Sequence, residues 1–234
     1  MAYPFFYKEE IDPLQDVKLD EATSKHIVQV LRMQQGAILQ LTNGKGNLYT
    51  VEIVDDNRKK CVVNIKESVI MAPPLNDISI GISIIKNTSR FEWFLEKATE
   101  ISVTQILPVI CERTEKTSFK IDRLNNILVS AMLQSQQCWL PVLHNPVSFK
   151  KVVDESLHQQ KFIAHCTEDA KQALTEICNP LLSSTLMLIG PEGDFTHAEI
   201  EYALANNFKA VTLGSTRLRT ETAGIVAATL LCNL

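Results

Sequence analysis

The sequence predicts an α/β protein of two domains, a small, mostly β domain at residues 1–72 and a larger α/β domain at residues 73–234. Three features lead to this division. Short strands dominate the first 70 residues, two prolines follow at Pro73 and Pro74, and strand-like and helix-like segments then alternate to the end of the sequence. Paired prolines stiffen a linker and stop the strands beside them, so they mark the domain boundary.

The N-terminal segment has the pattern of a small β-barrel. Residues 37–42 alternate between apolar and polar side chains and run into Asn43-Gly44-Lys45-Gly46, a strong hairpin signal. Residues 48–54 and 60–65 supply further strands, and residues 20–33 are expected to form a helix.

The larger segment reads as five βα units. Strands are expected at 78–85, 105–111, 161–166, 185–189 and 210–213. Helices are expected at 91–101, 122–138, 168–178, 196–206 and 221–232. Repeated βα units predict a mainly parallel sheet covered by helices on both faces.

Composition excludes several classes of protein. The chain has 234 residues and a formal charge of −4, which argues against nucleic-acid binding through a bulk positive field alone. No apolar run approaches the roughly 20 residues of a membrane span, and the start lacks the features of a signal peptide. The six cysteines are scattered without a C-x-x-C pair, which favours buried free thiols in a reduced, cytoplasmic protein.

Two glycine loops near the end of the chain are the strongest candidates for a binding site. Each follows a short apolar run and precedes a helix-like segment, the geometry in which backbone N–H groups converge on a ligand. They are Gly190-Pro191-Glu192-Gly193-Asp194 and Leu213-Gly214-Ser215-Thr216-Arg217-Leu218-Arg219. Thr196 and Glu199 have the spacing of a capping box, which predicts a helix start directly after the first loop.

The loops do not have the pattern of a phosphate site. The first strand of the α/β segment is followed by no glycine-rich loop, and Gly193 is followed by Asp194 and Phe195 rather than by Lys and Ser or Thr. Two acids, Glu192 and Asp194, also stand where a polyphosphate would lie. A nucleoside with a cationic or neutral tail suits such loops better.

Together the loops resemble a known pair of motifs. Gly190-Pro191-Glu192-Gly193, followed by Leu213-Gly214 and Arg217-Leu218-Arg219-Thr220-Glu221-Thr222-Ala223, is similar to the signature of the RsmE-type rRNA uridine methyltransferases of the SPOUT superfamily. Further segments resemble the same family, among them His26 with Val30-Leu31-Arg32, Lys97-Ala98-Thr99-Glu100, and Gln134-Ser135. The resemblance spans nearly the whole chain.

Four positions depart from the family pattern. Asp194 stands where a second glycine is usual, which affects the positioning of the first loop. Leu133 replaces an acid, Gln137 an arginine and Ser102 a glycine, and these changes weaken the transfer of RNA-contact roles to their segments.

The resemblance implies a fold and a reaction. The fold would be a PUA-like, RNA-binding β-barrel followed by a SPOUT domain whose C-terminal chain threads a trefoil knot. The reaction would be methylation of N3 of a uridine in small-subunit (16S) rRNA, with S-adenosylmethionine (AdoMet) as methyl donor, no metal, and a homodimer as the active assembly. The target base must be unpaired or flipped out, which suits an assembled small subunit as substrate.

Candidate cofactor and catalytic residues follow from the same motifs. Arg219 is the candidate cation that stabilises the uracil anion, or else it forms a salt bridge with Glu192 or Glu221; Glu221 is a candidate catalytic group, or else it caps a helix. The expected cofactor-binding residues are Ile189, Gly190, Glu192, Gly193, Leu213, Gly214, Ser215, Leu218, Arg219, Thr222 and Ala223.

Candidate RNA contacts lie in both domains, since lysine and arginine bind phosphates and amides read base edges. They are His26, Arg32, Lys86, Arg90, Lys97, Arg113 and Gln134. A mixed-charge solvated surface is the alternative for these residues. The alternatives for the whole protein are another RNA acceptor, such as a ribose 2′-oxygen or a different base atom, and a non-catalytic RNA-binding assembly factor.

Overall fold

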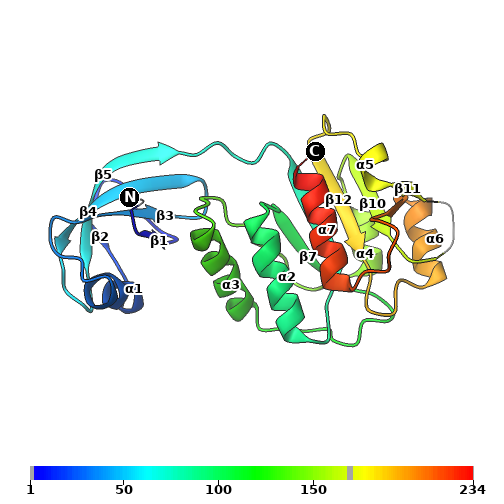
Figure 1. Cartoon of the computed structure of the whole chain (residues 1–234), viewed down its shortest axis with the longest axis horizontal. Helices are drawn as coiled ribbons and strands as arrows, with labels where there is room; N and C mark the ends of the chain where they lie inside the picture. The colour runs from blue at the N-terminus through cyan, green and yellow to red at the C-terminus, as the bar shows by residue number, and fades with distance from the viewer. Residues whose placement is uncertain (1–2, 168–170, 234) are drawn as a thin grey trace. The chain divides into compact units, whose positions relative to one another are not determined.

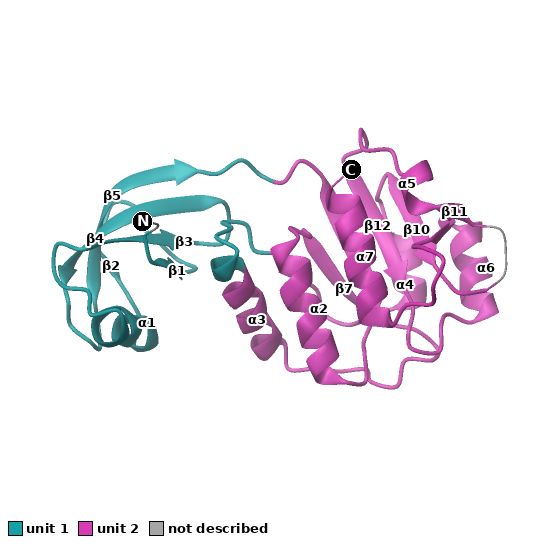
Figure 2. Cartoon of the chain, viewed as in Figure 1, with its two compact units in different colours: residues 1–73, 132–140 teal, residues 74–131, 141–234 magenta. Residues whose placement is uncertain are grey.

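The computed structural model describes residues 3–167 and 171–233, which form two compact units (Figures 1 and 2). The first unit contains residues 1–73 and 132–140, and the second contains residues 74–131 and 141–234. Residues 132–140 therefore belong with the small unit, although the sequence prediction placed them in the larger domain.

The first unit is built on a five-stranded sheet with the order β1-β3-β4-β5-β2. Its strands are β1 (Phe5–Tyr7), β2 (Val17–Lys18), β3 (Ile38–Thr42), β4 (Asn47–Asp55) and β5 (Val62–Ile70). β1 and β3 are parallel, and the remaining pairs are antiparallel. Apolar side chains that alternate along β3, β4 and β5 form its core, with Leu39, Val51 and Ile53 fully buried.

The predicted hairpin joins β3 to β4 through residues 43–46. Gly44 and Gly46 have φ values of +69° and +86°, which glycine adopts without strain. A Cβ atom on Gly46 would lie 2.2 Å from the Trp139 ring, so the turn also needs glycine because the 132–140 segment packs directly on it.

The predicted helix at residues 20–33 is shorter in the structure. α1 (Glu21–Lys25) begins at Asp20, whose carboxylate accepts from the Thr23 amide, and η1 (His26–Val30) continues it. The helix ends there because Arg32 has a φ of +55°, outside the helical region.

The second unit contains an eight-stranded sheet in which β11-β13-β10-β12-β6-β7-β8 are neighbours and β9 also pairs with β7. Every one of these pairings is parallel, as predicted. The strands are β6 (Asp77–Ser83), β7 (Gln105–Ile110), β8 (Val142–Leu143), β9 (Val147–Ser148), β10 (Gln160–Ala164), β11 (Gln172–Ala173), β12 (Ser184–Ile189) and β13 (Lys209–Thr212).

Helices cover both faces of this sheet. The helices after residue 74 are α2 (Thr88–Glu100), α3 (Ile121–Gln134), α4 (Phe149–Glu155), α5 (Leu174–Ile177), α6 (His197–Ala205) and α7 (Thr220–Cys232), and the last three residues of α3 belong to the first unit. α2 and α7 lie side by side on one face (Figure 1). α4 and α6 pack on the other face, where they share a core with β7, β10 and β12.

Two predicted helices end or begin elsewhere. α3 ends at Gln134 rather than at residue 138, since Gln136 has a φ of +56°. In place of a helix at 168–178, the structure has the strand β11 and the one-turn α5; residues 168–170 of that prediction lie outside the described residues.

The cysteines are all free thiols, as predicted, but they are not all buried. Cys61, Cys111 and Cys138 are buried, while Cys166 is exposed at the end of β10. Burial raises the pKa of Cys111 to about 12, so this thiol stays neutral. None of the helices in the described part of the chain has the length and hydropathy that a membrane crossing would need.

Candidate functional site

Two adjoining cavities lie where β10, β12 and β13 end. The first, of about 440 Å³, is lined by the Gly190–Asp194 loop together with Arg90 and Arg219. The second, of about 290 Å³, is lined by the loop at residues 213–218 and by Lys171. Both cavities include Ala164, Cys166, Arg217, Leu218 and Ala223. The shared wall means that one bent ligand could reach from one loop to the other.

The site lies at the carboxyl ends of the parallel strands, where the strand order predicts it. In open parallel sheets, ligands bind outside the carboxyl ends of the strands. β10 and β12 are hydrogen-bonded neighbours, with Ala164 paired to Ile189, and both strands end there. β13 pairs with the other side of β10, with Ala164 opposite Val211.

A larger cavity, of about 640 Å³, lies at the amino ends of the strands, where β6, β7 and β12 begin. Its polar groups bind one another. Asp77 accepts from the Thr104 hydroxyl at 2.6 Å and the Gln105 amide at 2.8 Å, while the Gln105 carbonyl is 2.9 Å from Nε2 of His144. Such a satisfied network is typical of structural polar clusters.

The first loop is fixed at its base by the helices that follow. Thr196 and Glu199 form the predicted capping box at the start of α6. Glu199 also accepts from the backbone N–H of Glu112, at 2.9 Å. The hydroxyl of Thr220, the first residue of α7, donates to the Gly190 carbonyl at 3.0 Å and is buried. α7 therefore holds the first loop directly, although 30 residues separate the two groups.

Asp194 fastens the first loop to the end of β10. Its Oδ2 accepts from the Cys166 amide at 2.7 Å, and its Oδ1 accepts from the Phe195 amide at 2.9 Å. The residue has a φ of +64°, in the left-handed region that is costly for most side chains but tolerated by aspartate. The carboxylate thus faces backbone amides and bridges two walls of the first cavity.

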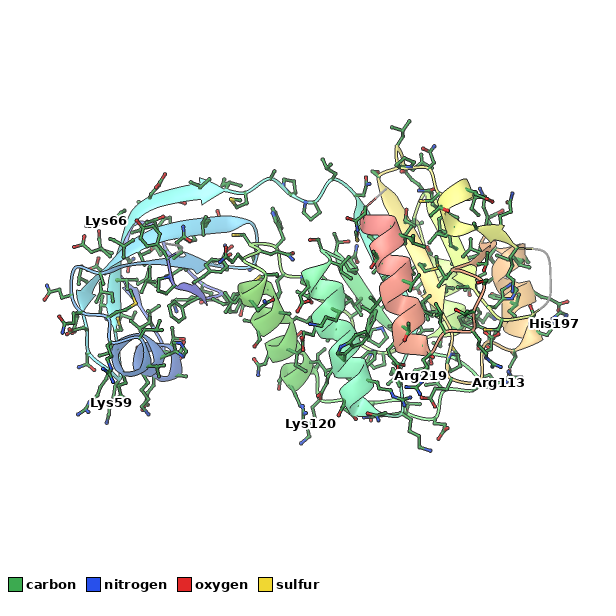
Figure 3. All side chains as sticks on the ribbon, viewed as in Figure 1. Lys59, Lys66, Arg113, Lys120, His197 and Arg219 are labelled. Carbon is green, nitrogen blue, oxygen red and sulfur yellow. The ribbon has the colours of Figure 1, made fainter. Side chains whose placement is uncertain are left out.

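Two arginines from other elements also hold this loop. Nη1 of Arg113, in the segment after β7, donates to the Gly193 carbonyl (Figure 3). Nη1 of Arg90, on α2, lies 3.2 Å from Oε1 of Glu192. Both arginines were predicted as RNA contacts from the sequence, and the structure places both on the glycine loop.

Glu221 lies buried in the first turn of α7, with 6% of its surface exposed. Its Oε1 is 3.6 Å from Nε of Arg90, and its Oε2 has no hydrogen-bond partner among the described residues. A buried carboxylate without pairing is costly, so Arg90 is its main compensation together with the positive end of the helix dipole.

Comparison with known proteins assigns the chain to a family. A family model described as an RNA methyltransferase domain matches residues 72–232, and one described as an RNA methyltransferase PUA domain matches residues 19–66. The ribosomal RNA small subunit methyltransferase E of Mesomycoplasma hyopneumoniae is 30% identical over 234 residues, 97% of each chain. The chain belongs to this family of rRNA methyltransferases.

Solved structures agree with this assignment over the whole chain. A probable rRNA-methyltransferase from Porphyromonas gingivalis is 36% identical, with a TM-score of 0.89 over 96% of this chain and 95% of that one. The ribosomal RNA small subunit methyltransferase E from Neisseria gonorrhoeae, solved with bound S-adenosyl methionine, is 29% identical, with a TM-score of 0.84 over 97% and 95% of the two chains. The α/β fold with a PUA-like N-terminal domain is therefore that of the family.

The cavities bring together most of the predicted cofactor residues. Nine line one cavity or both: Ile189, Gly190, Glu192, Leu213, Gly214, Ser215, Leu218, Arg219 and Ala223. Gly193 and Thr222 are not among the described lining residues; Gly193 instead supplies the carbonyl that binds Arg113.

The sequence prediction missed the third wall. Ala164 and Cys166 line both cavities, and Lys171 lines the second, where its ammonium donates to the His165 carbonyl at 2.9 Å. The available signal was a third buried strand, followed by His165, Cys166 and Thr167, next to the two glycine loops in the sheet. No glycine marks this turn, so it carried no motif.

Arg217 and Arg219 are the unpaired cations of the site. Both are exposed and line the first cavity, and neither side chain makes a hydrogen bond or ion pair with the described residues. The salt bridge to Glu192 or Glu221 that the sequence left open for Arg219 is made by Arg90 instead.

Of the remaining predicted RNA contacts, some side chains form ion pairs within the protein and others are exposed to solvent. Lys86 is exposed and lies 2.6 Å from Glu115, whose hydrogen bond raises the pKa of Lys86. Lys97 lies between Glu96 and Glu100. In the first unit, Arg32 and Gln134 are exposed, and His26 is exposed with its ring edge against Phe6.

Proposed function

We propose that this protein transfers the methyl group of AdoMet to N3 of a uridine in small-subunit rRNA. The observation that carries the proposal is the pair of adjoining cavities, each bordered by one glycine loop, with Arg219 in the first and Arg217 on the wall that they share. A methyl donor and an anionic acceptor base need these two environments next to each other. Membership of the rRNA methyltransferase family supports the choice of RNA as acceptor.

The residues present fit AdoMet. A Cβ atom at Gly214 would meet no other atom within 4 Å, so this backbone borders open space in the second cavity, and its φ of +143° requires glycine. Such an open loop, next to the apolar side chains of Val211 and Leu213, suits an adenosine. Glu192 lines the first cavity beside Arg90, and its carboxylate can also accept a hydrogen bond from the ammonium group of the methionine tail. AdoMet would supply an activated methyl group on a sulfonium, a chemistry that needs no metal.

The protein's own groups would position the base and stabilise its charge. The imide N3–H of uracil has a pKa above neutrality, so its proton must first pass to solvent. This leaves negative charge on the ring until N3 takes the methyl group and the bond between that methyl group and the sulfonium sulfur breaks, which gives a neutral methylated base and a neutral thioether. Arg219 is permanently charged, and its side chain has no ion-pair partner in the part of the chain that the structure describes, so we assign it to that charge. Arg217, which borders both cavities, is placed to bind the phosphate next to the target base. The loops align the reacting atoms and exclude water.

We further propose how the chain engages its RNA and assembles. The PUA-like unit would hold the RNA through His26, Arg32 and Gln134, while Lys86 and Lys97 contact the backbone near the site. The active form would be a homodimer whose C-terminal chain threads a trefoil knot, working in the cytoplasm on assembled small subunits. Such a knot would hold the start of α7 beside the first loop, where the Thr220 hydroxyl donates to the Gly190 carbonyl.

The experiment that tests this function is methyl transfer from labelled AdoMet to small ribosomal subunits that lack their own modification at such sites. Free rRNA serves as the parallel substrate. We expect label on the particle and much less on free rRNA, because only the particle holds the target base in a displayed conformation. Binding of AdoMet without transfer to either substrate would favour a non-catalytic assembly factor.

A further inference from the structure

Arg90 bridges the two acids of the site, Glu192 and Glu221. Its guanidinium lies between two carboxylates from different elements, at 3.2 Å from Glu192 in the first loop and 3.6 Å from Glu221 in α7. Its side chain is 36% exposed, whereas that of Glu221 is 8% exposed. α2 and α7 pack side by side, so the arginine is delivered from the neighbouring helix.

Without Arg90, Arg219 is the cation with which Glu192 or Glu221 would form an ion pair. It lines the same cavity as Glu192 and precedes Glu221 by only two residues, yet it makes no ion pair with the described residues. Glu221 has a buried Oε2 without a hydrogen-bond partner in the described part of the chain. A carboxylate in this state attracts the nearest mobile cation strongly, because the surrounding dielectric is low.

We propose that Arg90 is a positioning residue for methyl transfer, which keeps Arg219 available to the substrate by neutralising Glu192 and Glu221. This inference rests on the proposed function and deepens it. In the absence of Arg90, Arg219 pairs with one of the two acids, and the cavity loses the cation that faces the uracil. Arg90 therefore acts through Arg219 and not by touching RNA, the role first predicted for it.

The test compares three variants with the wild-type protein, with AdoMet varied at saturating particle: Arg90→Ala, Arg90→Lys, and Arg90→Ala combined with Glu192→Gln. We expect Arg90→Ala to lower kcat at least tenfold, with less than a threefold change in the KM for AdoMet. The double variant should have a kcat at least threefold higher than that of Arg90→Ala, because only one of the two carboxylates then remains to pair with Arg219. Arg90→Lys keeps a cation beside the acids and should retain more activity than Arg90→Ala.

Rescue by Glu192→Gln is the decisive result. If Arg90 instead binds RNA or only holds the loop in place, removing the charge of Glu192 cannot compensate for the loss of Arg90. A double variant whose kcat is no higher than that of Arg90→Ala therefore overturns the proposal. A wild-type rate in Arg90→Ala overturns it as well. Thermal melts of each variant identify any loss of folding, in which case the comparison rests on Arg90→Lys.

A second measurement does not depend on turnover. Phenylglyoxal modifies accessible, unpaired guanidinium groups, and peptide mass spectrometry reports the modification of Arg219 separately from that of Arg217. We expect slower labelling of Arg219 in Arg90→Ala than in the wild type, and labelling near the wild-type rate in the double variant. If the wild type transferred no methyl group, the proposed function would fail while this labelling still tested the inference. Equal labelling in all three proteins would contradict it.

Discussion

At the scale of single residues, the site is defined by which charges are paired and which are left open. The structure pairs Arg90 with two acids and Arg113 with a loop carbonyl, and it leaves Arg217 and Arg219 facing the cavity. Sequence reasoning named Arg90, Arg113 and Arg219 as site residues but not Arg217. It could not tell which of them are paired, because pairing depends on contacts across roughly 100 residues, as between Arg90 and Glu192.

Replacement of Arg219 tests its assignment to the substrate's charge. We expect Arg219→Ala to lower methyl transfer at least tenfold, about 1.4 kcal/mol of transition-state stabilisation, while the Kd for AdoMet changes little. Among the described residues, this side chain makes no hydrogen bond or ion pair that the fold would lose. Turnover and calorimetry are the measurements, and an equal loss of both would assign Arg219 to cofactor binding or loop structure instead.

Replacement of Asp194 tests the bridge between the first loop and the end of β10. Asp194→Ala removes both hydrogen bonds and keeps a costly positive φ, whereas Asp194→Gly removes the bonds but relieves the backbone. We expect AdoMet affinity to fall about fivefold in Asp194→Ala, which corresponds to roughly one hydrogen bond, and less in Asp194→Gly. Calorimetry measures both, and unchanged affinity in both variants would show that the bridge does not shape the cavity.

At the scale of elements, the packing of α7 on α2 and β6 places the start of α7 at the site. Gly224 is the contact point. A Cβ atom there would lie 2.7 Å from the Phe94 ring of α2 and 3.0 Å from Ile82 of β6, and both of these side chains are fully buried. The close packing at this glycine fixes the position of the first turn of α7, which contains Thr220 and Glu221, relative to the first loop.

Gly224→Ala should therefore destabilise the protein although alanine is the better helix former. The gain in helix propensity is about 1 kcal/mol, and the cost of forcing a methyl group into a filled core is about 1–3 kcal/mol. We expect a net loss of roughly 1 kcal/mol, seen as a lower midpoint in urea unfolding. Thr229→Ala, at an exposed position of the same helix, is the control and should shift the midpoint little. A more stable Gly224→Ala variant would contradict this description of the helix contact.

Element prediction succeeded where local signals agreed with tertiary contacts. The capping box at Thr196 and the hairpin at residues 43–46 are short-range devices, so the sequence alone placed them correctly. The end of the helix at Val30 and the strand β11 depend on the left-handed Arg32 and on pairing with β13, respectively. Neither has a local signal, and both were missed.

At the scale of the whole molecule, the order of the strands creates the site. Segments at residues 164–166, 189–194 and 213–219 meet because β10 is flanked by β12 and β13. The glycine loops predicted two of these three segments. The third could not be predicted, because strand order in a parallel sheet is set by the packing of distant helices and not by the strand's own sequence.

The most direct test of the central claim is nucleoside mass spectrometry of small subunits after reaction with labelled AdoMet. The proposed function predicts that the label appears in digested rRNA as 3-methyluridine and in no other nucleoside. Label in a 2′-O-methylated nucleoside or on another base would keep the fold and the cofactor but contradict the acceptor. An absence of label, from particles known to lack the modification, would contradict the assignment of this site to methyl transfer.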